Sequence, residues 1–206
     1  MHLYEYGSYS ELKENEAEGK DYCIRYREGK TGIVVMAPHA GDIEPATGEL
    51  ADAVAGKEHS FYAFWGLKAK NNAALHISST RFDEPIAVNL AQKSNTVLTI
   101  HGSKETRKLI YIGGRDKKLK HIIQKALQGI EIEVGELSRL QGIKPENICN
   151  RSRSGQGVQL EISAGLRKEF YGGVSATALN KSNRHFVKLV NALRDALSNY
   201  LSPVSR

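Results

Sequence analysis

A continuous apolar run, Ile33–Ala37 (IVVMA), places the tightest constraint on how this chain can fold. A run of β-branched and apolar residues without polar alternation is typical of a strand that is buried on both faces. The run ends at Pro38, and the loop that follows carries His39 and Glu44. In open α/β sheets, ligands bind beyond the carboxyl ends of the strands, so this loop is a candidate for polar chemistry.

The rest of the chain alternates between segments that favour strands and segments that favour helices. The pattern predicts further strands at 22–27, 60–66, 75–80, 95–100, 107–112, 130–134 and 158–163, and helices at 8–15, 49–55, 86–92, 116–127 and 178–200. Turn residues at 28–32 predict that residues 22–37 form a β-hairpin. The alternation indicates an α/β fold with a mostly parallel sheet and helices on both faces.

Length and composition favour one globular domain. The 206 residues are enough for a full hydrophobic core, and 40% of them are apolar. The formal net charge of +6 indicates an acidic partner, either nucleic acid or a polyanionic substrate, although many basic proteins are merely kept soluble by such a charge.

The N-terminal residues show no signal-peptide pattern, and no apolar run is long enough to span a membrane. We therefore expect a protein that is made in the cytoplasm, does not contact membranes, and reaches the outside through cell lysis if it acts there.

Three expected strands end in residues that can bind metal or transfer protons. His39 and Glu44 follow the first, His101 ends the second, and Glu161 lies near the end of the third. If these strands share one sheet, the four residues meet at its carboxyl edge. Two histidines and one carboxylate with an open fourth position form the ligand set of zinc hydrolases, and a further glutamate can take a proton from zinc-activated water. Alternatively, both histidines only cap strand ends through hydrogen bonds.

Four segments together resemble the poly-γ-glutamate hydrolase family, which comprises zinc-dependent enzymes of phages and prophages in Bacillus-type hosts. They are Met36–Pro45 (MAPHAGDIEP), Ser78–Pro85 (SSTRFDEP), Thr99–Gly102 (TIHG) and Gly157–Ser163 (GVQLEIS). The resemblance extends over nearly the whole chain. It implies a single catalytic domain with a mixed, mostly parallel sheet between helices, similar to zinc carboxypeptidases.

The resemblance also implies roles for single residues. His39, Glu44 and His101 match the zinc ligands, and Glu161 takes the place of the general base. Four residues separate His39 from Glu44, whereas two separate the corresponding ligands in the carboxypeptidase pattern.

Basic residues are the expected contacts of a polymer that carries one free carboxylate per residue, because arginine binds carboxylates in a bidentate manner. We expect Arg153 and Arg81 to bind substrate carboxylates, and Arg151 and Arg167 to be surface charges. His76 could orient a zinc ligand from a neighbouring position, but a core histidine is the simpler interpretation.

The prediction from sequence is therefore a zinc-dependent hydrolase that cleaves the γ-glutamyl amide bonds of poly-γ-glutamate. Three alternatives remain open at this point. They are a zinc amidase for another acylated amino acid or peptide, a phage nucleic-acid-binding protein of the kind used in replication, and a non-catalytic module that binds the polymer. No helix-turn-helix or other nucleic-acid-binding motif supports the second.

Overall fold

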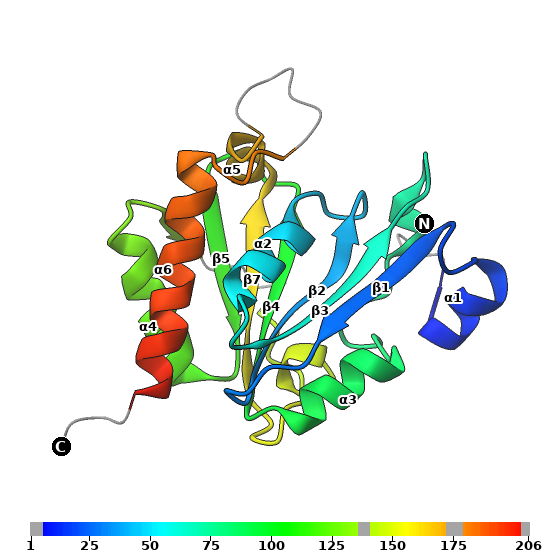
Figure 1. The fold of residues 1–206 in the computed structure, drawn as a ribbon, viewed down its shortest axis with the longest axis horizontal. Coiled ribbons are helices and arrows are strands. Elements are labelled where there is room, and N and C mark those ends of the chain that lie inside the picture. The colour runs from blue at the N-terminus through cyan, green and yellow to red at the C-terminus, as the bar shows by residue number, and fades with distance from the viewer. Residues whose placement is uncertain (1–5, 136–140, 172–178, 203–206) are drawn as a thin grey trace.

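The computed structural model describes residues 6–135, 141–171 and 179–202, and these form one mixed sheet with helices on both faces (Figure 1). The strands are β1 (Tyr22–Arg27), β2 (Ile33–Gly41), β3 (Ser60–Gly66), β4 (Thr96–Ser103), β5 (Leu109–Gly114), β6 (Glu133–Gly135) and β7 (Gly157–Ser163). The α-helices are α1 (Tyr9–Asn15), α2 (Thr47–Ala55), α3 (Pro85–Lys93), α4 (Lys117–Gln128), α5 (Ala164–Glu169) and α6 (Arg184–Leu201). Two short 3-10 helices, η1 (Asn72–Leu75) and η2 (Ile148–Asn150), complete the described elements.

The strands lie in the order β1-β3-β2-β4-β7-β5-β6. β3, β2, β4 and β7 are parallel to one another, whereas β1, β5 and β6 run in the opposite direction. This arrangement confirms the expected α/β fold with a mixed, mostly parallel sheet. It also places the carboxyl ends of β2, β4 and β7 side by side, which is the condition for their terminal residues to meet.

Each face of the sheet packs against its own layer of helices. α2, α4 and α6 cover one face, and α3 lies with η2 on the other (Figure 1). In β2, Val35 and Ala37 belong to the core under α2, whereas Val34 and Met36 belong to the core under α3. All four are fully buried, which explains why the sequence shows an unbroken apolar run there instead of alternation.

A β-bulge in β2 changes which face its last residues occupy. Between Ala37 and Ala40, β2 has one residue more than the paired segment of β3, which runs from Ala63 to Trp65. Because side chains alternate along a strand, one extra residue reverses the order of the faces. Ala40 therefore packs with Ala37 in the core under α2, and His39 points to the opposite face.

Two of the expected elements are wrong. Residues 22–37 do not form a hairpin, because β1 pairs with β3 and β2 lies between β3 and β4. Residues 75–80 are not a strand: η1 ends at Leu75, and the following backbone is irregular. Its carbonyl groups are used elsewhere, since Ile77 O accepts a hydrogen bond from His39 and Ser79 O accepts one from Ile148 N.

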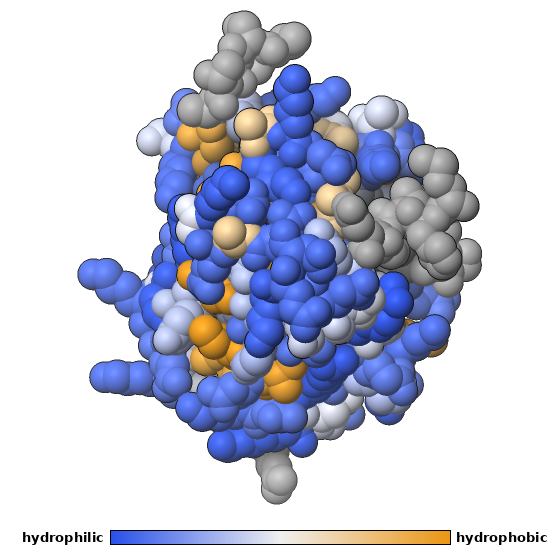
Figure 2. All heavy atoms as spheres, turned by 90° about the vertical axis from the view of Figure 1, so that its right-hand side faces the viewer, coloured by the Kyte–Doolittle hydropathy of each residue, from blue (hydrophilic) through white to orange (hydrophobic). Residues whose placement is uncertain are grey.

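The side of the molecule that carries β1 and α1 is mostly hydrophilic, with small and separate hydrophobic patches (Figure 2). β1 is an edge strand, and its exposed residues include Arg25 and Tyr26. Charged side chains on an edge strand oppose pairing with other chains. Among the described helices, none combines the length and the apolar character that crossing a membrane requires.

We expect Leu98→Ala to lower the free energy of unfolding by about 2–5 kcal/mol, because it leaves a cavity in the core under α2. Leu98 is fully buried in the central strand β4. Leu67→Ala is the matched control, since Leu67 is 38% exposed, and it should cost far less. Urea denaturation of both variants measures the difference, and equal losses would contradict the described core.

Candidate metal centre and active site

His39, Glu44 and His101 converge at the carboxyl edge of the sheet. His39 comes from the bulge of β2, Glu44 from the loop after β2, and His101 from β4. His39 Nδ1 lies 3.2 Å from His101 Nδ1 and 3.3 Å from Glu44 Oε1, and His101 Nδ1 lies 3.6 Å from Glu44 Oε2. One ligand atom from each residue lies within 4.8 Å of the others, so the three form a compact group that can hold a metal ion.

The spacing of these atoms matches a zinc site. Zinc binds histidine nitrogen and carboxylate oxygen at about 2.0–2.2 Å, and a tetrahedral arrangement then separates neighbouring ligand atoms by roughly 3.3–3.5 Å. The two histidine nitrogens are 3.2 Å apart, His39 Nδ1 is 3.3 Å from Glu44 Oε1, and His101 Nδ1 is 3.6 Å from the other oxygen, Oε2. Each histidine is therefore at about this spacing from one oxygen of the carboxylate. The donor set of two nitrogens and one carboxylate oxygen leaves a fourth position open, as in catalytic zinc sites.

The surrounding backbone orients His39. Its Nε2 donates a hydrogen bond to Ile77 O over 2.7 Å, which leaves Nδ1 with its lone pair directed toward Glu44 and His101. Burial, with a further contribution from His76, lowers the pKa of His39 to about 4. The imidazole is therefore neutral at pH 7, as metal binding requires.

Glu44 is held as a carboxylate. Burial alone would raise its pKa, but His39 and the hydrogen bonds of the neighbouring histidines bring that pKa well below its usual value. Gly102 N–H donates to Glu44 Oε2 over 2.8 Å. Residue 102 must also be small, because a Cβ there would lie 2.7 Å from Arg167 Cζ. This close approach gives a physical reason for the glycine that follows His101.

Glu161 lies beside the three residues. It pairs with His101 in the register of β4 and β7, so both side chains point to the face opposite the core under α2. Glu161 is 7% exposed. Its burial, reinforced by the charge of Glu44 and opposed by His101, raises its pKa to about 7. A carboxyl group with a pKa near the working pH can both accept and return a proton.

A buried amide chain orients Glu161. Gln159 Nε2 donates to Glu161 Oε1 over 2.9 Å, and Asn147 Nδ2 donates to Gln159 Oε1 over 2.9 Å. Asn147 Oδ1 accepts from Cys149 N, so the Asn147 amide cannot flip without losing two bonds. Sequence analysis missed this chain. The alternation of β7 places Gln159 two residues before Glu161 on the same face, but nothing in the sequence reveals Asn147 as its partner.

His76 lies closer to the site than its sequence context suggested. Its ring stacks on His39 with the ring centroids 3.7 Å apart, and His76 Nε2 lies 3.6 Å from Glu44 Oε1. It therefore contacts two of the three converging residues rather than serving only as part of the core.

Arg167 lies at the site, whereas the sequence favoured a surface charge for it. Its guanidinium packs over Gly102 and donates hydrogen bonds to the carbonyl oxygens of Ile162, Pro45 and Ser103 over 2.8–3.1 Å. It thereby joins the ends of β4 and β7 to the loop that carries Glu44. Its positive charge also contributes to lowering the pKa of Glu161.

The other three arginines lie farther from the converging residues. Arg151 donates to the carbonyl oxygens of Thr80, Phe82 and Glu146, which fixes the loop after η1. Arg81 is exposed on that loop.

Arg153 lies at the opposite edge of the sheet, where its N–H donates to Ser94 O before the start of β4. It precedes Gly157, which is about 13 Å from Glu161 along β7. The structure therefore does not bring Arg153 to the site.

Comparison with known proteins shows the family of this chain. The sequence model of the family described as poly-gamma-glutamate hydrolase matches residues 6–192. The UPF0714 protein YndL of Bacillus subtilis (strain 168) is 34% identical over 186 residues, which cover 88% of this chain and 73% of YndL.

Two solved structures share the fold at similar identity. A bacteriophage poly-gamma-glutamate hydrolase has a TM-score of 0.90 and 33% identity, covering 95% of this chain and 97% of the other. A zinc-free structure of YndL has a TM-score of 0.84 and 33% identity, covering 95% and 98%. Because the family model spans most of the chain and the fold agrees over nearly its whole length, this chain belongs to the poly-γ-glutamate hydrolase family, whose members are hydrolases of γ-glutamyl amide bonds.

Proposed function

We propose that this chain, as a single catalytic domain, hydrolyses the γ-glutamyl amide bonds of poly-γ-glutamate with a zinc ion held by His39, Glu44 and His101. The observation that carries the proposal is the mutual spacing of 3.2–3.6 Å between His39 Nδ1, His101 Nδ1 and the Glu44 carboxylate oxygens. Zinc-free YndL, which is 33% identical, supports zinc as the metal. A bound zinc ion would polarise the amide carbonyl and lower the pKa of water to about 7.

Glu161 performs the proton transfers. Its Oε1 accepts the hydrogen bond of Gln159, so Oε2 is the oxygen that takes the proton of the attacking water. Glu161 then gives this proton to the leaving amine, which completes hydrolysis of the amide bond. Gln159 and Asn147 keep the carboxyl group directed toward the converging residues during both transfers.

Arg167 supplies positive charge for the substrate. Three of its five N–H donors are used by backbone carbonyl groups. Among the residues that the structure describes, none accepts from the other two, and we assign these to an α-carboxylate of the polymer or to the developing oxyanion. Among the four arginines considered from sequence, Arg167 is the one packed directly over Gly102. We keep exposed Arg81 as a second carboxylate contact and give Arg153 no place in the active site.

The function is tested by measuring polymer length on a gel after incubation with the purified protein. We expect poly-γ-glutamate to shorten, α-linked polyglutamate to stay intact, and a chelator to stop cleavage until zinc is restored. If zinc-loaded protein leaves γ-linked polymer intact but releases small acyl groups from amino acids or peptides, the amidase alternative replaces the proposal. Cleavage that persists in the presence of chelator would exclude the metal.

The ligand set is tested by measuring zinc content after dialysis. We expect His39→Ala and His101→Ala to lose most of the zinc that the wild-type protein retains, because two protein ligands no longer hold the ion tightly. His121→Ala is the control, since His121 is exposed on α4, and it should retain zinc. Equal retention in all three variants would rule out this site.

The role of Glu161 is tested through kcat. We expect Glu161→Gln to lower kcat by about 10²–10⁴-fold, because the amide cannot accept the proton, while zinc content stays at the wild-type level. Gln159→Leu should lower kcat less and leave KM and zinc content unchanged, because it removes only the orientation of Glu161. A Glu161→Gln variant with wild-type kcat would falsify the assignment of the base.

A further inference from the structure

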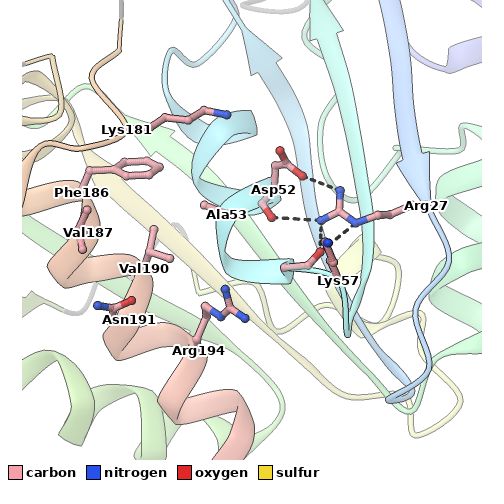
Figure 3. Close-up of a pocket in the computed structure, with 11 residues that line it drawn as sticks. Arg27, Asp52, Ala53, Lys57, Lys181, Phe186, Val187, Val190, Asn191 and Arg194 are labelled. Carbon is pink, nitrogen blue, oxygen red and sulfur yellow. Dashed lines mark hydrogen bonds and ion pairs between the residues drawn. The ribbon is translucent and has the colours of Figure 1, made fainter.

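A groove of about 650 Å³ lies between α2 and α6, on the face of the sheet opposite to His39 and Glu161 (Figure 3). Four cationic side chains line it, namely Arg27, Lys57, Lys181 and Arg194, and Asp52 is the one carboxylate among the described lining residues. The groove is therefore electropositive, and the mechanism at the carboxyl edge makes no use of it.

Two of the four cations form no ion pair among the described residues. Arg27 is paired with Asp52 at 2.5 Å, and Arg194 with Glu58 at 3.2 Å. Lys57 and Lys181 are exposed, and neither ammonium group forms an ion pair with a carboxylate in the described part of the chain. These two lysines are thus available to bind anionic groups of a ligand.

Part of the groove wall on α6 is apolar. Phe186, Val187 and Val190 line it between Lys181 and Arg194 (Figure 3). Val187 is 39% exposed and is one of the few large hydrophobic residues at the described surface. A ligand that fits such a groove has alternating methylene and anionic groups, so that its apolar parts cover the valines while its charges reach the lysines.

Helix α2 connects the groove to the active site. The loop with Glu44 leads directly into the first turn of α2, and Gly56 and Lys57 after its last turn line the groove. Burial raises the pKa of Glu49 in the first turn, and the charge of Lys181 partly offsets that shift. Figure 3 shows Lys181 beside the first turns of α2 and Lys57 beyond its last turn, roughly 13 Å apart along the helix.

We propose that the groove between α2 and α6 is a second binding site, which holds a distal segment of the same poly-γ-glutamate chain that is cleaved at the carboxyl edge. This inference rests on the proposed function for its substrate. Each γ-linked residue carries one free carboxylate, and its two side-chain methylene groups form part of the polymer backbone. Carboxylates and methylene groups therefore alternate along the polymer, as the cationic and apolar residues do along the groove. Binding a second segment raises the effective concentration of scissile bonds at the active site.

The test uses a charge-reversed double variant, Lys57→Glu/Lys181→Glu, and a matched control, Lys13→Glu/Lys144→Glu. The control makes the same change in net charge at two exposed lysines, one on α1 and one before η2. Each variant is compared with the wild-type zinc-loaded protein on long poly-γ-glutamate and on γ-linked triglutamate. Binding of fluorescein-labelled polymer is measured separately by anisotropy, with Glu161→Gln added to every protein.

We expect the groove variant to raise KM for the long polymer roughly tenfold, because it replaces two exposed ion pairs with repulsion between like charges. Its kcat, and its KM for triglutamate, should not change, because the short substrate does not reach the groove. The control should change KM for the long polymer much less at 0.15 M salt, where charges beyond about 8 Å are largely screened.

Equal losses in the groove and control variants, or unchanged binding of labelled polymer by the groove variant, would overturn the proposal. Tighter binding of single-stranded DNA than of polymer, lost in the groove variant, would assign the groove to nucleic acid instead. If the wild-type protein cleaves neither substrate, the proposed function fails, and the anisotropy measurement still decides whether the groove binds the polymer.

Discussion

The extra residue in β2 between Ala37 and Ala40 is the constraint on which the candidate active site depends. Without it, the regular alternation would direct His39 toward α2, into a core of aliphatic side chains. The bulge directs His39 to the face where His101 and Glu161 lie, and it does so beside Pro38, which has no N–H to donate to a ladder. Bulges are common next to active sites because they re-aim one side chain without disturbing the rest of the sheet.

The cost of burying polar groups explains why hydrogen-bond partners surround the site residues. Glu44, His39, His101 and Glu161 are all removed from most contact with water, and each needs hydrogen-bond partners inside the protein. The backbone at Ile77 and Gly102 supplies some of these partners, and Gln159 supplies another. The irregular segment after η1 can do this because it is not part of the sheet, so its carbonyl groups are free to bind side chains.

The two proposed contacts with an anionic polymer differ in how firmly their cations are held. Arg167 is fixed by three backbone carbonyl groups, so its position costs little ordering when substrate binds. Lys57 and Lys181 are exposed, and in the proposed second site they would hold the polymer more weakly. In this proposal, a fixed cation positions the polymer near the scissile bond, and exposed cations along α2 hold another segment loosely.

The sequence by itself determined the α/β fold class, most of the strands and helices, and the residue types that gather at the carboxyl edge. Hydrophobic periodicity and strand ends are local properties, so His39, His101 and Glu161 could be placed at strand ends from their neighbours alone. The order of the strands is not local: β1 pairs with β3, and the hairpin expected from the turn at 28–32 does not form.

Only the tertiary structure decided the bulge, the partners of Glu161, and the backbone carbonyl groups that hold Arg167 over Gly102. Arg153 and Arg167 flank the same strand β7, one before its start and one after its end, so the rule that ligands bind at the carboxyl ends of strands favours Arg167. The rule applies only if β7 lies parallel to β4 and β2, and that pairing depends on contacts between segments far apart in the chain.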